Sequence, residues 1–196
     1  MILLDPDLDS HIAPRSIPAV RRGTQDRAAK TQRDRIPSAR SLEGFLREAQ
    51  AAVRLRGQVT VLLTTDAAIR RLNRRFRGKD KATDVLSFPA AGPAAGNVAG
   101  DLAISVATAR RQAFKEKHAL SLEIKVLMLH GLLHLAGYDH EMDQGRMARR
   151  EVVLRKKLGL PVGLIERAGK TNRRQIQKLP TKKSASAKAA RGGAGS

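Results

Sequence analysis

Three histidines lie close together in the segment HGLLHLAGYDH, residues 130–140. His130 and His134 are four residues apart, so a helix would place both imidazoles on one face, within reach of the same cation. Gly137 favours a left-handed helix end, after which the chain can turn and bring His140 back to the same point. Three nitrogen ligands with an open fourth position are typical of a catalytic zinc ion. We therefore predict a metal site formed by these three histidines, against the alternative of three ordinary helix and loop histidines.

The residue after the first histidine bears on the reaction. The spacing matches the metzincin peptidase frame, but zinc peptidases of the H-E-x-x-H type carry a glutamate at this position as their general base. This chain has Gly131 there. Phosphoryl transfer depends less on a protein base, because a metal and cationic side chains stabilise the charge on the transferred phosphate. We therefore expect a phosphodiesterase acting on nucleic acid, with a metal-dependent peptidase as an alternative.

The elements that must position these residues follow from the apolar pattern. Alternating or β-branched runs predict strands, and apolar residues three and four apart predict helices. Helices and strands then alternate as in an α/β or α+β fold, with about five helices packed on a small mixed sheet of about four strands in a single domain. The predicted strands are residues 58–64, 83–89 and 100–105, with a possible edge strand in 1–9. The predicted helices are 41–55 with Ser41 as its N-cap, 66–76 capped by Thr65 or Asp66, 106–117, 121–136 and 143–158.

The domain organisation is predicted from changes in composition. Residues 1–9 contain the possible edge strand, and residues 10–40, rich in arginine and proline, read as a basic flexible insertion. Residues 41–160 carry the periodic apolar pattern of the folded domain. Residues 161–196 read as a basic, disordered tail, because lysine, alanine, glycine and serine cannot bury enough surface to fold.

The net charge of +20 is the strongest global signal. A field of this sign attracts polyanions by counterion release and steering. From residue 168 onward there are eight basic residues and no acidic one; taking these eight charges from +20 leaves +12, so the rest of the chain is basic too. With four Phe, one Tyr and no Trp, extensive base stacking is not expected, and contact would be mainly with phosphate and sugar.

Other classes of protein are excluded by composition. The chain has no cysteine, which excludes disulfides, thiolate zinc sites and cysteine nucleophiles. Its first residues lack the basic start of a signal peptide, and no apolar run approaches the roughly 20 residues of a membrane span. We expect a cytoplasmic protein without a membrane partner.

Three blocks of this sequence resemble the YbeY family of bacterial endoribonucleases. They are HGLLHLAGYDH, LNRRFRGKDKATDVLSFP (residues 72–89) and GDLAIS (residues 100–105), within a resemblance that covers about residues 42–160. The resemblance implies one α/β domain with one Zn²⁺ per chain. It also implies cleavage of single-stranded RNA, maturation of the 16S rRNA 3′ end in ribosome biogenesis, association with the small ribosomal subunit, and no DNA specificity.

The resemblance also assigns residues. It makes His130, His134 and His140 the zinc ligands, and Arg77 the family's functional arginine in a cavity near the metal. A guanidinium suits that task because it stays charged and binds phosphate in a bidentate manner, although an exposed surface arginine is the alternative. The chain departs from the family at Gly145 and Arg146, where acidic residues are usual; the later family residues Met147 and Glu151 match.

The aspartates near these blocks admit two interpretations each. Asp101 could accept a hydrogen bond from a ligand histidine or cap a strand, and Asp139 is equally ambiguous. For Asp84 the structural interpretation is favoured, and Ser87 could be a turn or cavity residue.

The resulting hypothesis is a zinc-dependent endoribonuclease. The zinc lowers the pKa of a bound water to near 7, and Arg77 and the ligand His134 are the catalytic residues that we predict. A non-catalytic ribosome-assembly factor with a structural metal is the second alternative, after the peptidase.

Overall fold

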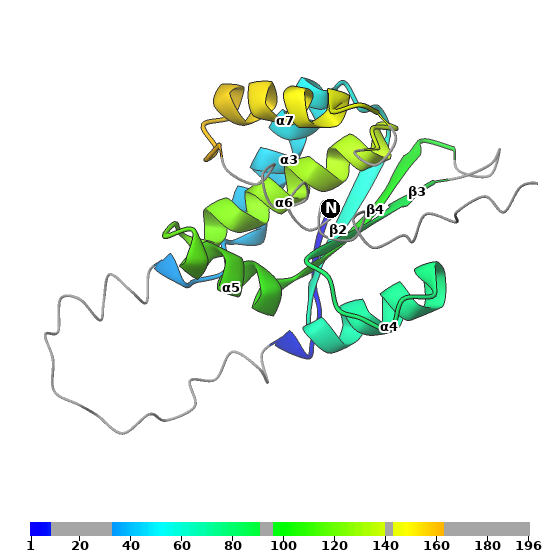
Figure 1. Ribbon diagram of the computed structural model, residues 1–196, viewed down its shortest axis with the longest axis vertical. Helices are drawn as coiled ribbons and strands as arrows, with labels where there is room; N and C mark the ends of the chain where they lie inside the picture. Colours follow the sequence, from blue (N-terminus) through cyan, green and yellow to red (C-terminus); the bar gives the residue numbers. More distant parts are fainter. Residues whose placement is uncertain (9–32, 91–95, 140–142, 163–196) are drawn as a thin grey trace, which may run out of the picture. The chain divides into compact units, whose positions relative to one another are not determined.

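A four-stranded mixed sheet forms the centre of the structure, a computed structural model that describes residues 1–8, 33–90, 96–139 and 143–162 (Figure 1). All of these lie in the unit Met1–Val162. The strand order is β1-β2-β4-β3, with β1 parallel to β2, β2 parallel to β4, and β3 antiparallel to β4. The strands are β1 Ile2–Leu4, β2 Gln58–Thr64, β3 Val85–Pro89 and β4 Val98–Ser105. The described helices are α3 Ala39–Val53, α4 Asp66–Arg77, α5 Val106–Lys115, α6 Leu120–Leu135 and α7 Arg146–Lys157. The predicted fold class is confirmed.

The two faces of the sheet carry different helices. Leu86 of β3 and its partner Ala103 of β4 form a buried cluster with Ile69 of α4. Their neighbours in sequence point to the opposite face, because side chains alternate along a strand. There, Ser87 and Leu102 meet α6 at Gly131. Helix α4 therefore packs on one face of the sheet and α6 on the other, where α3 and α7 also lie (Figure 1).

Helix α6 is buried around most of its circumference. It contacts β3 and β4 on one side and α3, α5 and α7 on others, which explains why its sequence is apolar nearly all round. Helix α4 is its opposite, with one apolar stripe against the sheet and arginines over the rest. Among the described residues, no helix is both long enough and apolar enough to cross a membrane.

Several predicted boundaries shift because of hydrogen bonds that sequence patterns do not reveal. The predicted N-cap Ser41 is wrong: Ser38 caps α3, its hydroxyl accepting from the Ser41 amide at 3.3 Å. The predicted strand 83–89 begins later, at Val85, because the Asp84 carboxylate accepts from the Val85 amide at 2.9 Å and from the Thr83 hydroxyl at 3.0 Å. These bonds confirm the structural interpretation of Asp84. Residues 9–32 and 163–196, which include most of the predicted insertion and tail, lie outside the described residues.

Candidate metal and active site

His130 and His134 lie side by side on α6, as their spacing predicts. Their Nε2 atoms are 3.2 Å apart, and the two rings are nearly perpendicular, at 74° with 4.8 Å between centroids. Two imidazole ligands of a tetrahedral zinc ion, each about 2.0–2.1 Å from the metal, have nitrogens about 3.3 Å apart. The two side chains therefore already have the separation that a shared metal ion requires.

The second nitrogen of His130 is held by a buried carboxylate. Its Nδ1 lies 3.1 Å from Oε2 of Glu151, a side chain of α7 that is only 3% exposed. A carboxylate at Nδ1 keeps the proton on that nitrogen and leaves the lone pair of Nε2 for a metal. Glu151 thus sets the ring orientation and tautomer that a ligand histidine needs.

Glu151 is in turn held by Arg155, one turn further along α7. The Arg155 Nε donates to Oε1 at 2.8 Å, a second guanidinium nitrogen binds the same oxygen, and a third donates to the carbonyl of Pro161 at 3.1 Å. Burial raises the pKa of Glu151, but His130 and Arg155 together outweigh it and hold this pKa below its ordinary value. The carboxylate is therefore ionised, with both oxygens bonded.

The carboxylate that bonds Nδ1 of His130 is that of Glu151 and not that of Asp101. Asp101 is exposed on β4, opposite Phe88. Sequence reasoning noted Glu151 as a family residue but gave it no role. Glu151 is 21 residues from His130, and only the packing of α7 against α6 brings the two together.

Gly131 is required by the packing of α6 against the sheet. A Cβ atom at this position would lie 2.7 Å from Cδ2 of the buried Leu102 and 3.2 Å from Oγ of Ser87. Position 131 faces the strands, so a glutamate there has no space and could not act as the general base of a peptidase. The structure thus gives a packing reason for the residue that departs from the peptidase pattern.

The turn after α6 has the predicted left-handed glycine. Gly137 has φ +85°, its amide donates to the carbonyl of His134 at 3.0 Å, and the Tyr138 amide donates to the carbonyl of Leu133 at 3.0 Å. These two bonds form a Schellman motif, which ends α6 and satisfies two of its last carbonyls. His140 itself lies outside the described residues. In the described part of the chain no group of three potential metal ligands is found, so the third ligand stays a prediction.

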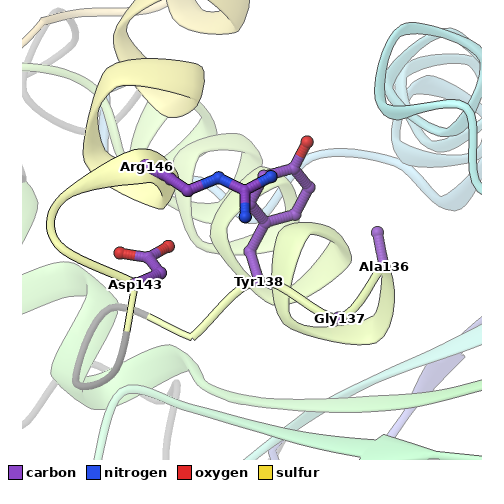
Figure 2. Close-up of a pocket in the computed structure, with 5 residues that line it drawn as sticks. All are labelled: Ala136, Gly137, Tyr138, Asp143 and Arg146. Carbon is purple, nitrogen blue, oxygen red and sulfur yellow. The ribbon is translucent and has the colours of Figure 1, made fainter.

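A hollow of about 240 Å³ opens at this end of α6 (Figure 2). Its lining includes Tyr138 from the turn and Arg146 from the first turn of α7, both drawn as sticks in Figure 2. Asp143 also lines it, and its carboxylate accepts from the amides of Gly145 and Met147 at 3.0 and 2.7 Å, which caps α7. The hollow thus lies between the C-terminal end of α6 and the start of α7.

Comparison with known proteins identifies the family. The family model for "Endoribonuclease YbeY" matches residues 24–159. The curated "Endoribonuclease YbeY" of Solibacter usitatus is 55% identical over 127 residues, which cover 65% of this chain and 84% of that protein. The one from Koribacter versatilis is 50% identical over 133 residues, covering 68% and 86%. The chain belongs to the YbeY family of endoribonucleases. It is thus an enzyme that hydrolyses RNA.

A solved structure, the solution structure of TM1509 from Thermotoga maritima, is 26% identical, covers 76% of this chain and 96% of that one, and has a TM-score of 0.43.

Membership of the YbeY family favours the nuclease over the peptidase and the non-catalytic factor. It does not by itself place Arg77, which is exposed as the last residue of α4. Helix α4 lies on the sheet face opposite α6, the helix that carries His130 and His134. The predicted role of Arg77 beside the metal therefore stays a prediction. Ser87 does lie at the site, with its hydroxyl 3.4 Å from the carbonyl of Gly131.

Proposed function

We propose that this endoribonuclease cleaves single-stranded RNA at a zinc ion held by His130, His134 and His140, with one ion per chain. The observation that carries the proposal is the pair of Nε2 atoms 3.2 Å apart, one of them on a ring fixed by the buried Glu151. When bound, the ion would supply Lewis-acid chemistry for the attack on a phosphodiester.

The protein groups have separate tasks in this proposal. Glu151 keeps the His130 ring oriented and its Nε2 unprotonated, and Arg155 keeps Glu151 ionised. Arg77 neutralises charge on the phosphate, and its side chain reaches the phosphate from the α4 side of the edge strand β3. His134 provides the second ligand and is fixed by the same packed helix.

We also propose the substrate and the setting. The family membership and the net charge of +20 support ribosomal RNA, and in particular the late maturation of the 16S rRNA 3′ end on the small ribosomal subunit in the cytoplasm. Incubation of small subunits that carry 3′-extended 16S rRNA with the purified protein should yield the mature end, as mapped by sequencing. Cleavage of free single-stranded RNA without shortening of that precursor would contradict the ribosomal part of the proposal alone.

The role of Arg77 is tested by Arg77→Glu, with Arg47→Glu on α3 as a control that removes another exposed arginine from a different helix. Loss of a group that stabilises transition-state charge lowers the rate about 100-fold or more. We expect Arg77→Glu to lower cleavage of single-stranded RNA by that amount and Arg47→Glu to change it less than threefold. Equal rates in the two variants would remove Arg77 from the active site.

A further inference from the structure

The outward face of α4 is a basic surface that the proposed active site does not use. Four of its arginines, Arg70, Arg71, Arg74 and Arg75, are exposed, and the helix has one acidic residue, Asp66, in its first turn. Like charges four residues apart on a helix destabilise it. This face contains two such pairs, 70 with 74 and 71 with 75. A bound polyanion would offset this repulsion, because its negative charges attract each of the arginines.

Intramolecular carboxylates neutralise only part of this face. Arg70 forms a bidentate ion pair with Asp80, at 2.8 and 2.6 Å. For Arg71, Arg74 and Arg75, no carboxylate in the described ranges lies within 4.0 Å, although the more distant charges of Asp5 and Asp80 act on Arg71 and Arg74. Three guanidiniums on adjacent turns are therefore available to phosphate groups.

An exposed aromatic ring adjoins these guanidiniums. Phe76 is 57% exposed, yet its ring packs edge-on against Phe88 of β3, with 5.1 Å between centroids at 67°. The Arg75 guanidinium carbon lies 5.3 Å from the centroid of the Phe76 ring. An aromatic ring held by a neighbour and flanked by a cation is the arrangement on which unpaired bases stack. Phe114 on α5 is more exposed, at 80%, but has no ring contact among the described residues.

The position of this face links it to the proposed active site. Phe88 and Ser87 are neighbours on β3, which is an edge strand of the sheet and pairs with β4. Phe88 supports Phe76 on one face, and Ser87 contacts Gly131, next to His130, on the other. A single strand that crosses the β3 edge would touch both surfaces. The Asn73 side chain donates to the carbonyl of Lys81 at 2.7 Å, which ties the loop after α4 to that helix.

We propose that Arg71, Arg74, Arg75 and Phe76 bind the part of a single-stranded RNA that lies beyond the cleaved bond, with one base stacked on Phe76 and the phosphates on the arginines. This inference rests on the proposed function for the class of substrate. It assigns a second contact surface, on the opposite face of the sheet from the histidines. It also implies that long substrates use this surface and that short ones do not.

The test compares matched variants in binding to a labelled 20-nucleotide single-stranded RNA and to a 4-nucleotide one. Phe76→Ala and Phe76→Leu should weaken binding of the long RNA at least about fivefold, the lower end of the loss from one stacked base, whereas Phe114→Ala should not. The leucine variant keeps an apolar side chain against Phe88, so it separates lost stacking from lost packing. Binding of the short RNA should be unchanged in all three.

The charge component has its own control. Replacing Arg71, Arg74 and Arg75 together with Gln should reduce the slope of log affinity against log salt by about 2, because each phosphate that the protein neutralises on a single strand contributes about 0.7 to that slope. The same replacement of Arg40, Arg47 and Arg56, three exposed arginines on and after α3, should leave the slope unchanged.

The outcomes separate the two proposals. If wild type neither binds nor cleaves single-stranded RNA, the proposed function fails. If wild type binds and cleaves, but the Phe76 and α4 arginine variants match their controls, this inference is overturned and the proposed function stands. If the Phe76 variants lost as much affinity for double-stranded RNA as for single-stranded RNA, the proposed base stacking would also be overturned, since paired bases cannot stack on Phe76.

Discussion

Helices α6 and α4 pack on opposite faces of the same two strands and present their polar groups in opposite ways. On α6, two half-buried histidines lie side by side, and the buried residues Glu151 and Arg155 fix one of them. On α4, arginines point into solvent and few are fixed by a partner. Each group around the histidines is held in one position by its neighbours, so the loss of any one of them disturbs the others. Exposed charges act through their sum, so each contributes little and salt weakens all of them.

The largest effect on the free energy of unfolding is expected when a buried arginine is replaced, and almost none when an exposed one is replaced. Arg155→Met leaves the Glu151 carboxylate buried without its guanidinium, which should lower the free energy of unfolding by about 3–5 kcal/mol. Arg71→Met, the same change on α4, should alter it by less than about 0.5 kcal/mol. Denaturant unfolding of both variants measures the difference, and equal losses would mean that the buried pair has no special role.

The double variant Glu151→Leu with Arg155→Met sharpens this result. Removing both charges avoids the unpaired carboxylate, so much of the lost stability should return. Zinc affinity should nevertheless stay about 10- to 100-fold below wild type, because His130 has lost the acceptor for its Nδ1 proton. Competition with a chromophoric chelator measures it. Wild-type affinity in the double variant would show that Glu151 does not position the histidine.

Two helical glycines give smaller effects of opposite sign. A Cβ atom added at Gly44 on α3 would have no neighbouring atom within 4 Å, so Gly44→Ala should stabilise the protein by about 1 kcal/mol through helix propensity. Gly131→Ala gains the same propensity but pushes Leu102 in a packed core, which costs about 1–3 kcal/mol. We expect Gly131→Ala to lower Tm and Gly44→Ala to raise it. A rise in both would mean that α6 does not pack tightly against the sheet.

The smallest effect that we predict is on how the stability of the protein depends on pH, through Asp66 at the start of α4. Burial raises the pKa of Asp66, but bonds from Ser105, Thr108 and Arg111 outweigh it, so this pKa lies below its ordinary value. A carboxyl whose folded pKa is lowered stabilises the fold above its unfolded pKa, and this contribution is lost as pH falls through the folded pKa. Stability should thus decline below about pH 3.8, and Asp66→Asn should flatten that decline. An unchanged pH profile in the variant would contradict the assignment.

Local patterns predict the elements, and long-range contacts explain what those patterns miss. Strand 58–64 is predicted to the residue because β-branched alternation is a local property. The end of α6 is predicted to within one residue, because glycine at position 137 favours the left-handed end of a helix. The pair His130–His134 follows from helical spacing alone. The Glu151 contact could not be predicted, because it depends on how α7 packs on α6. The opposed positions of α4 and α6 depend on the strand order, which puts β4 between β2 and β3.

The most direct test of the histidine site is turnover of a single-stranded RNA by wild type and His134→Ala, with zinc content measured on both preparations. The metal-site account predicts about one zinc per chain and cleavage in wild type, with both lost in the variant while its far-ultraviolet circular dichroism is unchanged. Full zinc content and full cleavage in a folded His134→Ala protein would contradict it.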